Sequence, residues 1–204
     1  MISFANAKIN IGLSITEKRS DGYHNIETIF YPVKMYDVLE FGDSDSYSFE
    51  ALGIDIPQDG VNLCTKAYQI LQNDYTIRPI SIKLLKNIPI GAGLGGGSSD
   101  AAFVLKALNE LNNLGLTEEQ LQQYASKLGA DCSFFISNKP VFAEGIGTEF
   151  SEVEVDLSTY FIVIIKPEIH ISTAEAYSNI TPQVPKVDLR RAIKLPIQEW
   201  KYYI

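Results

Sequence analysis

A run of glycines ends in two serines within residues 87–102, NIPIGAGLGGGSSDAA, and leads directly into a segment with helical hydrophobic spacing. Free N–H groups at a helix N-terminus and the positive end of the helix dipole attract phosphate, and glycine lets the backbone approach closely. Ser98 and Ser99 add hydroxyl donors. The alternative is a flexible loop in which one of these serines is an ordinary N-cap. Five glycines within seven residues favour phosphate binding.

Two common nucleotide-binding patterns do not fit this loop. Gly91, Gly93 and Gly96 satisfy G-x-G-x-x-G, but no strand ending in an acidic residue follows at the distance that a dinucleotide-binding unit needs. The P-loop form also fails, because no G-K-[ST] closes the run. The residues therefore disfavour NAD and leave open which phosphate the loop holds.

Other polar residues could carry chemistry, although each has a structural explanation. Lys8 and Asn10 alternate along an expected strand and lie about 7 Å apart on the same side. A lysine at the edge of a sheet is usually a solvated charge. Asp131 precedes an apolar run, which is typical of a helix N-cap. Tyr23 and His24 end a turn, where such rings are often structural.

The composition is that of an acidic globular protein. With 204 residues and 46% hydrophobic content, the chain can bury one core domain, or one domain and part of a second. The formal net charge of −8 gives little reason for binding nucleic acid or anionic lipid. No apolar run approaches the roughly 20 residues of a membrane span, and no secretory signal is visible, so we expect a cytoplasmic protein without a membrane partner. Cys64 and Cys132 are expected to be reduced structural thiols, and two histidines argue against a His-built metal site.

Hydrophobic spacing predicts an α+β fold, because strands precede and flank helices without a regular βαβ repeat. Alternation predicts a half-buried strand over residues 4–16, and strands are expected at 24–33, 36–41, 80–88 and 161–167. Helices are expected at 61–75, from the glycine-rich loop to Gly115, at 117–129, 172–180 and 187–193. Asn62 is a plausible N-cap, and Thr117 with Gln120 fits a capping box.

Five motifs, in order from Ala7 to about Tyr177, resemble those of the GHMP kinases, small-molecule kinases whose ATP triphosphate sits on such a loop. These motifs are AKINIGLSI, KRSDGYHNIETIF, PIGAGLGGGSSDAA, GADCSFF and AEGIG. Taken together, the motifs are similar to those of the GHMP kinases that act in the non-mevalonate isoprenoid pathway. These kinases phosphorylate a hydroxyl of a cytidine diphosphate-linked methylerythritol. The resemblance implies a GHMP-kinase-like two-lobe fold and the cofactors ATP and Mg²⁺.

The resemblance also implies the ATP-binding and catalytic residues. Lys8 matches the family's lysine that orients the reacting hydroxyl, and Asp131 matches the catalytic aspartate that accepts its proton. Mg²⁺ is expected to arrive with ATP and to keep several waters, with Ser98, Ser99 and Asp100 considered as ligands and the set left open. The implied ATP-binding residues are Pro89, Ile90, Gly91, Ala92, Gly93, Leu94, Gly95, Gly96, Gly97, Ser98 and Ser99.

The small-molecule substrate is implied to contact four residues. Asn10 matches a substrate-contacting asparagine, Tyr23 the aromatic ring that stacks on cytosine, and His24 the histidine that recognises the hydrogen-bonding edge of the base. Tyr177 takes the place of the aromatic residue on the other face. Stacking tolerates exchange among aromatic rings, so tyrosine is chemically acceptable at both positions.

The C-terminal part departs from the family pattern. Full-length members carry a second Gly-Ser-rich loop within a second lobe, and this sequence ends at PIQEWKYYI without it. We therefore expect a complete N-terminal lobe at 1–155 and the beginning of a truncated C-terminal lobe at 156–204, which leaves the activity of this chain open.

Three other functions remain as alternatives. The nearest is another GHMP kinase acting on homoserine, mevalonate or a sugar, although the turn DGYH at 21–24 favours the cytidine substrate. A different class is an inactive nucleotide-binding fragment, and an NAD-dependent enzyme is disfavoured. The sequence does not define the oligomeric state.

Overall fold

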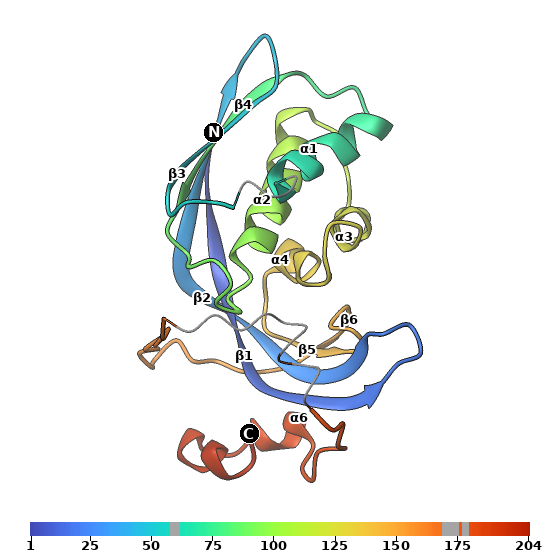
Figure 1. Ribbon diagram of the computed structural model, residues 1–204, viewed down its shortest axis with the longest axis vertical. Coiled ribbons are helices and arrows are strands. Elements are labelled where there is room, and N and C mark those ends of the chain that lie inside the picture. The colour runs from blue at the N-terminus through green and yellow to red at the C-terminus, as the bar shows by residue number, and fades with distance from the viewer. Residues whose placement is uncertain (58–61, 169–175, 177–179) are drawn as a thin grey trace. The chain divides into compact units, whose positions relative to one another are not determined.

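The computed structural model describes residues 1–57, 62–168, 176 and 180–204. The chain forms two compact units, the first made of Met1–Ile9 with Pro32–Lys139, and the second of Asn10–Tyr31 with Pro140–Ile204. Strands β1 (Ile2–Lys18) and β2 (His24–Asp43) pair with each other, and each contributes residues to both units (Figure 1).

The first unit is built on a sheet in which β4 (Ile80–Lys86) lies between β2 and β3 (Ser48–Gly53). β4 runs antiparallel to β2 and parallel to β3, where Gly53 pairs with Lys86. Alternation along β4 gives one buried set of side chains, as the period of two requires. That set consists of Ile80, Ile82, Leu84 and Lys86. The last inward position of this strand is thus a lysine.

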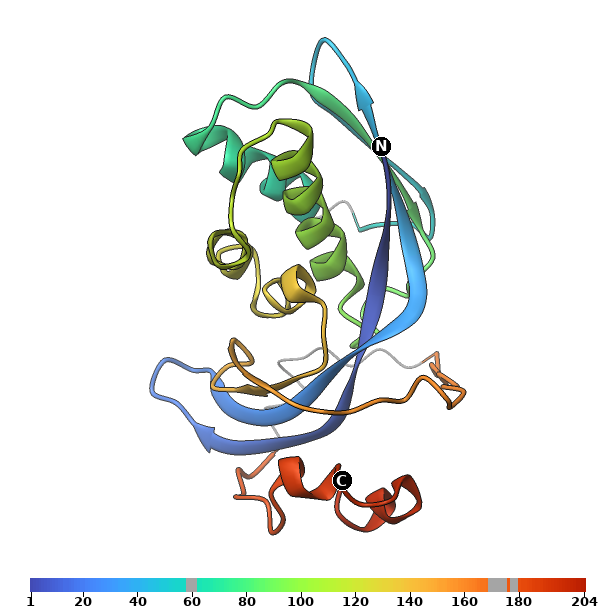
Figure 2. The same ribbon diagram turned by 180° about the vertical axis from the view of Figure 1, so that it is seen from behind.

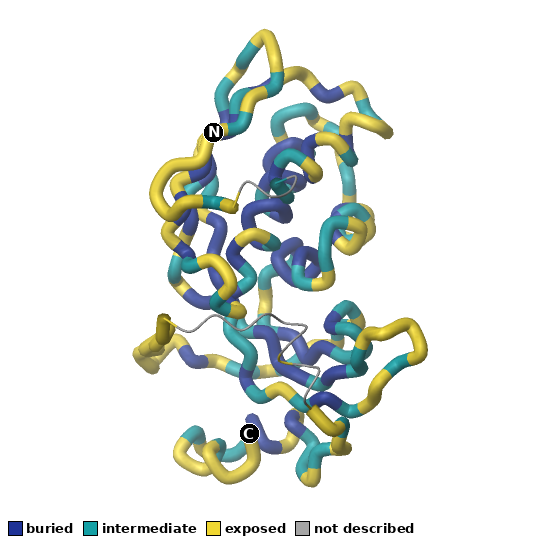
Figure 3. The backbone as a smooth tube through the Cα atoms, in the orientation of Figure 1, coloured by how far each residue is buried: buried dark blue, intermediate teal, exposed yellow. Residues whose placement is uncertain are grey.

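Helices cover one face of this sheet, as Figures 1 and 2 show from opposite sides. They are α1 (Leu63–Asp74), α2 (Gly96–Leu111), α3 (Glu118–Ser126), the 3₁₀ helix η1 (Ala130–Cys132) and α4 (Phe134–Ser137). Helix α2 packs against α1, α3 and α4, and most of it is buried (Figure 3). Burying each of its Val or Leu side chains stabilises the fold by about 1.5–3 kcal/mol. The core of the first unit therefore fixes the position of α2, and with it the end of the loop that leads into this helix.

Two predicted helix caps are confirmed. The Asn62 side chain accepts a hydrogen bond from the Cys64 N–H at 2.7 Å, and Thr117 and Gln120 form a reciprocal capping box. Each satisfies N–H groups that the first turn of a helix leaves without an internal partner. Cys64 and Cys132 are buried and free, as predicted.

In the second unit, β2 pairs antiparallel with β5 (Val141–Glu144), and β5 pairs antiparallel with β6 (Glu149–Glu152). Helix α6 (Leu189–Ala192) begins at its N-cap Asp188, which confirms the predicted short helix, and the 3₁₀ helix η2 (Ile197–Tyr202) follows. None of the helices in the described part of the chain has the length and hydropathy that crossing a membrane requires.

One strand prediction was wrong, and two predicted strands proved to be continuous. The segments 24–33 and 36–41 form one strand, β2, because the two residues between them, Lys34 and Met35, offer no turn-forming residue. The segment 161–167 forms no strand with the described residues, and Phe161 is fully exposed. An apolar run becomes a buried strand only where a partner strand satisfies its backbone. The predicted helix at 172–180 falls mostly outside the described residues.

The polar side of β1 also differs from the prediction of a half-buried strand. Asn6 and Lys8 are each only 5% exposed. The amides of Asn6 and Asn138 donate to each other at 3.1 and 2.7 Å, and the Lys8 N–H donates to the Leu94 carbonyl at 2.9 Å. Because other segments of the first unit cover both of its faces, this part of β1 is buried on both sides.

Candidate active site

An open cleft of about 420 Å³ lies in the first unit, at the start of α2. Its lining includes the apolar side chains of Ile56 and Leu63, the polar side chain of Asn62, and residues 89–98. Pockets for small molecules commonly span about 300–1,000 Å³ and combine apolar walls with a few polar groups. The apolar side chains suit a nucleotide base, and the N–H groups of the loop and helix start suit its phosphates.

Glycines give the loop its backbone conformation. Gly91, Gly93 and Gly95 have φ of 67°, 71° and 68°, in the left-handed region that favours glycine. A Cβ on Gly93 would meet no atom within 4 Å, whereas a Cβ on Gly95 would lie 2.9 Å from the Phe135 ring and 3.1 Å from Lys8 Cγ. Conformation alone therefore favours glycine at 93, and conformation and space together favour it at 95.

The two serines occupy different environments inside the first turn of α2. The N-cap is Gly95, so the alternative in which Ser98 or Ser99 caps the helix is wrong. Ser98 lines the cleft, while Ser99 is fully buried and its hydroxyl has no hydrogen-bond partner among the described residues. The cap position falls at Gly95 because its left-handed backbone leads directly into the helix. First-turn N–H groups thus remain for a ligand, and Ser98 is the serine that lines the cleft.

Lys8 and Asp131 form an ion pair beside this loop. Lys8 Nζ lies 3.4 Å from Asp131 Oδ2, and their side chains are 7% and 33% exposed. Burial lowers the pKa of Lys8, and the charge of Asp131 partly offsets this effect. Asp131 makes no capping hydrogen bond, because it lies within η1 behind the N-cap Gly129. A partly exposed carboxylate held by a buried ammonium can receive a proton from a molecule in solvent.

The other predicted site residues belong to the second unit. Asn10 donates to the Thr28 hydroxyl at 3.0 Å, so its side chain is held in a fixed direction. Tyr23 is 63% exposed in the turn before β2, and its N–H donates to Asp21 at 3.0 Å. His24 is the first residue of β2 and is half-buried. Tyr177 lies outside the described residues.

Sequence reasoning considered Asp100 only as a metal ligand and missed the buried cluster to which it belongs, in which Lys86 and Asp100 line the cleft. Asp37, Lys86 and Asp100 are 0%, 3% and 2% exposed, and Lys86 is paired with both carboxylates. Burial raises the pKa of Asp100 to about 8, the nearby Asp37 adds to this shift, and Lys86 opposes it. The period of β4 was the available signal, because it places Lys86 on the inward side of the strand.

The residues at the cleft fit a metal that arrives with its nucleotide. Within the described ranges, no group of three or more His, Cys, Asp or Glu side chains is arranged to hold a metal ion. Mg²⁺ bound to nucleotide phosphates keeps several waters and needs only one or two protein ligands. The Ser98 hydroxyl at the cleft is suitable for one such contact.

The fold and this cleft define a small-molecule kinase of the GHMP class. Residues 62–139 match the family profile described as GHMP kinases N terminal domain. The chain is 54% identical to the 4-diphosphocytidyl-2-C-methyl-D-erythritol kinase of Bacteroides thetaiotaomicron, in an alignment that covers 98% of this chain and 75% of the relative. It is 51% identical to the enzyme of that name from Parabacteroides distasonis, covering 98% and 74%.

A solved structure supports the same assignment. The crystal structure of 4-(cytidine 5'-diphospho)-2C-methyl-D-erythritol kinase matches with 36% identity and a TM-score of 0.67, over 76% of this chain and 56% of that chain. The chain belongs to the 4-diphosphocytidyl-2-C-methyl-D-erythritol kinase family within the GHMP kinases. The resemblance found in the sequence is therefore confirmed, as is the GHMP-type fold.

Proposed function

We propose that this protein transfers the γ-phosphoryl group of ATP to a hydroxyl of 4-diphosphocytidyl-2-C-methyl-D-erythritol, in the cytoplasm, where ATP is supplied. The observation that carries the proposal is the Lys8–Asp131 pair, which lies beside the glycine-rich loop in the same unit. The names of the similar proteins point to the substrate.

Phosphoryl transfer needs mainly positioning and electrostatic stabilisation. In this proposal, the glycine-rich loop and the first turn of α2 hold the triphosphate by backbone N–H groups. Mg²⁺, when bound with ATP, would neutralise charge on the phosphates, and Ser98, which lines the cleft, would contact it. These groups fix the donor and leave the acceptor to be oriented by the catalytic pair.

The acceptor hydroxyl is handled by two side chains. Asp131 accepts its proton, a role typically contributing about 10²–10⁴ in rate. Lys8 orients the hydroxyl and stabilises the negative charge that develops nearby. Its contact with Asp131 and its backbone hydrogen bond to Leu94 tie both roles to the loop that holds ATP.

The cytidine end of the substrate is proposed to bind the residues that the family motifs assign to it. Tyr23 is exposed enough to stack on a base, and His24 follows it directly with a ring that can hydrogen-bond to a base edge. Asn10 is proposed to contact the substrate because it matches the substrate-contacting asparagine of the family motif AKINIGLSI. Tyr177 remains a proposal from the sequence resemblance.

A steady-state kinase assay tests the proposal. ADP release by the chain is measured with the cytidine substrate, mevalonate, homoserine and a sugar. Lys8→Ala and Asp131→Asn are each expected to reduce turnover by about two orders of magnitude or more while the protein stays folded at the assay temperature.

Two exposed residues supply matched controls. Lys34→Ala removes a lysine from β2, and Asp43→Asn removes a carboxylate whose side chain is 86% exposed. Both are expected to keep the turnover of the unmodified chain. Near-normal turnover by Asp131→Asn would show that this carboxylate is not the proton acceptor, and preference for another acceptor would refute the substrate.

A further inference from the structure

Three charged side chains from three elements meet in the interior of the first unit. Asp37 comes from β2, Lys86 from the end of β4 and Asp100 from α2, four residues after the first residue of that helix. The Lys86 ammonium contacts the Asp37 carboxylate and lies 3.2 Å from Asp100 Oδ2. Buried charges are strongly unfavourable unless they are paired, so each of the three constrains where the other two lie.

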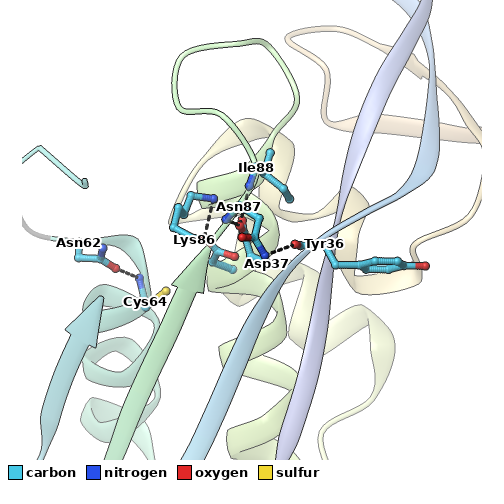
Figure 4. A network of polar contacts seen from close by, with 8 residues as sticks. Tyr36, Asp37, Asn62, Cys64, Lys86, Asn87 and Ile88 are labelled. Carbon is cyan, nitrogen blue, oxygen red and sulfur yellow. Dashed lines mark hydrogen bonds and ion pairs between the residues drawn. The ribbon is translucent and has the colours of Figure 1, made fainter. Parts of the chain in front are cut away.

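The cluster holds the entrance of the glycine-rich loop. Asp37 Oδ1 accepts hydrogen bonds from the backbone N–H groups of Asn87 at 2.6 Å and Ile88 at 2.8 Å (Figure 4). The Asn87 side chain donates to the Tyr36 carbonyl at 3.2 Å. These bonds attach the two residues that precede Pro89 to neighbouring positions of β2, which the core holds in place.

The same cluster holds the exit of the loop. Lys86 Nζ lies 2.8 Å from the position that a Cβ on Gly96 would occupy, and Ile88 Cγ2 lies 2.9 Å from it. The backbone of Gly96 thus packs directly against the lysine. Asp100, four residues further along α2, pairs with the same ammonium. Lys86 therefore packs against the exit of the loop and pairs with Asp37, which binds the entrance.

We propose that Asp37, Lys86 and Asp100 are positioning residues that set the glycine-rich loop in the geometry that binds the phosphates of ATP. They contact the loop ends and each other. Lys86 and Asp100 also line the cleft, whereas Asp37 does not, so Asp37 acts on the nucleotide only through the loop. This inference rests on the proposed function, because it requires that the loop bind ATP. A loop whose ends are fixed before binding loses less conformational freedom when it closes on its ligand, which raises affinity.

Nearly isosteric variants of the full chain test this role. Asp37→Asn places an amide opposite the N–H groups of residues 87 and 88, and Lys86→Met removes the ammonium but keeps the length of the side chain. The matched controls are Asp43→Asn and Lys83→Met, two exposed positions on the same strands. The dissociation constant of MgATP is measured by calorimetric titration, and KM for ATP, KM for the acceptor and kcat are measured by ADP release.

Both cluster variants are expected to raise the dissociation constant and the KM of ATP at least tenfold. The KM of the acceptor and kcat at saturating ATP should change less than twofold, and the controls should match the unmodified chain. A lower melting temperature with an unchanged dissociation constant for ATP would overturn the inference, because a purely structural role predicts that result. If the unmodified chain itself bound no MgATP, the proposed function would fail first.

A measurement on the unmodified chain decides the question if the variants do not fold. Amide hydrogen exchange of Asn87 and Ile88 is followed without and with MgATP. Slow exchange at both amides in the nucleotide-free protein is expected, because Asp37 holds them before ATP binds. Exchange at the rate of an unstructured peptide, slowed only by MgATP, would show that the loop ends are not fixed in advance and would overturn the inference.

Discussion

Gly95 offers a sharp test of how the glycine-rich loop is packed. Alanine at this position would have to adopt a φ near 68°, which costs an L-residue about 1–2 kcal/mol. Its Cβ would also lie 2.9 Å from the Phe135 ring and 3.1 Å from Lys8 Cγ, and overpacking of this kind typically costs about 1–3 kcal/mol. Gly95→Ala should therefore lower the free energy of unfolding by about 2–5 kcal/mol.

Two other glycines of the same loop separate the causes. Gly93 has a φ of 71° but open space around its Cβ position, so Gly93→Ala should cost only the conformational part, about 1–2 kcal/mol. Gly97 lies in α2, and the nearest atom to its Cβ position is 4.0 Å away. Gly97→Ala should stabilise the protein by about 0.5–1 kcal/mol, because alanine favours the helix.

Urea unfolding of the three variants measures these differences, provided that the free energy of unfolding depends on urea concentration with the same slope in each variant. Gly95→Ala should also reduce turnover more than Gly93→Ala, because its methyl group displaces Lys8, and a shift of about 1 Å at a reacting group can cost roughly a hundredfold. Equal losses of stability in Gly93→Ala and Gly95→Ala would refute the argument, since they would mean that Phe135 and Lys8 yield without cost.

Three further predictions concern other parts of the molecule. Burial raises the pKa of the Cys64 thiol, and it raises the pKa of the Cys132 thiol to about 11. Both thiols should therefore react with a disulfide reagent at pH 8 far more slowly than free cysteine, and MgATP should slow Cys64 further because it lines the cleft; rapid reaction of both would contradict this. Thr117→Ala should lower the free energy of unfolding in urea by about 1 kcal/mol, because the Thr117 hydroxyl caps α3. Thr117→Ser keeps a hydroxyl and should lower it less; equal losses in the two variants would show that the cap is unimportant. Tyr23→Ala should raise KM for the cytidine substrate without changing the melting temperature, whereas Tyr23→Phe keeps KM near that of the unmodified chain; an unchanged KM in the alanine variant would exclude stacking.

Features that depend on neighbouring residues could be read directly from the sequence. The glycine-rich loop followed by a helix, the cap at Asn62 and the capping box at Thr117 all follow from backbone conformation and hydrogen bonds within a few residues. The start of α2 was less certain, because serine and glycine can both precede a helix. The left-handed φ of Gly95 and its packing against Phe135 and Lys8 together explain why the cap is a glycine. The order of the five motifs was sufficient for the family.

Features that depend on distant elements were decided by the tertiary structure. Nothing near Lys8 in the sequence indicates that its face of β1 is covered and that Asp131 lies beside it. The pairing of Lys86 with Asp37 and Asp100 needs β4, β2 and α2 to converge, so the period of one strand could place the lysine inward but could not supply its partners. The segment 161–167 shows the opposite outcome. Its apolar residues favour a strand, but a strand requires a partner strand, and the sequence pattern alone does not provide one. Burial and charge pairing are properties of the assembled fold, and for this protein they determine which polar residues form the candidate site.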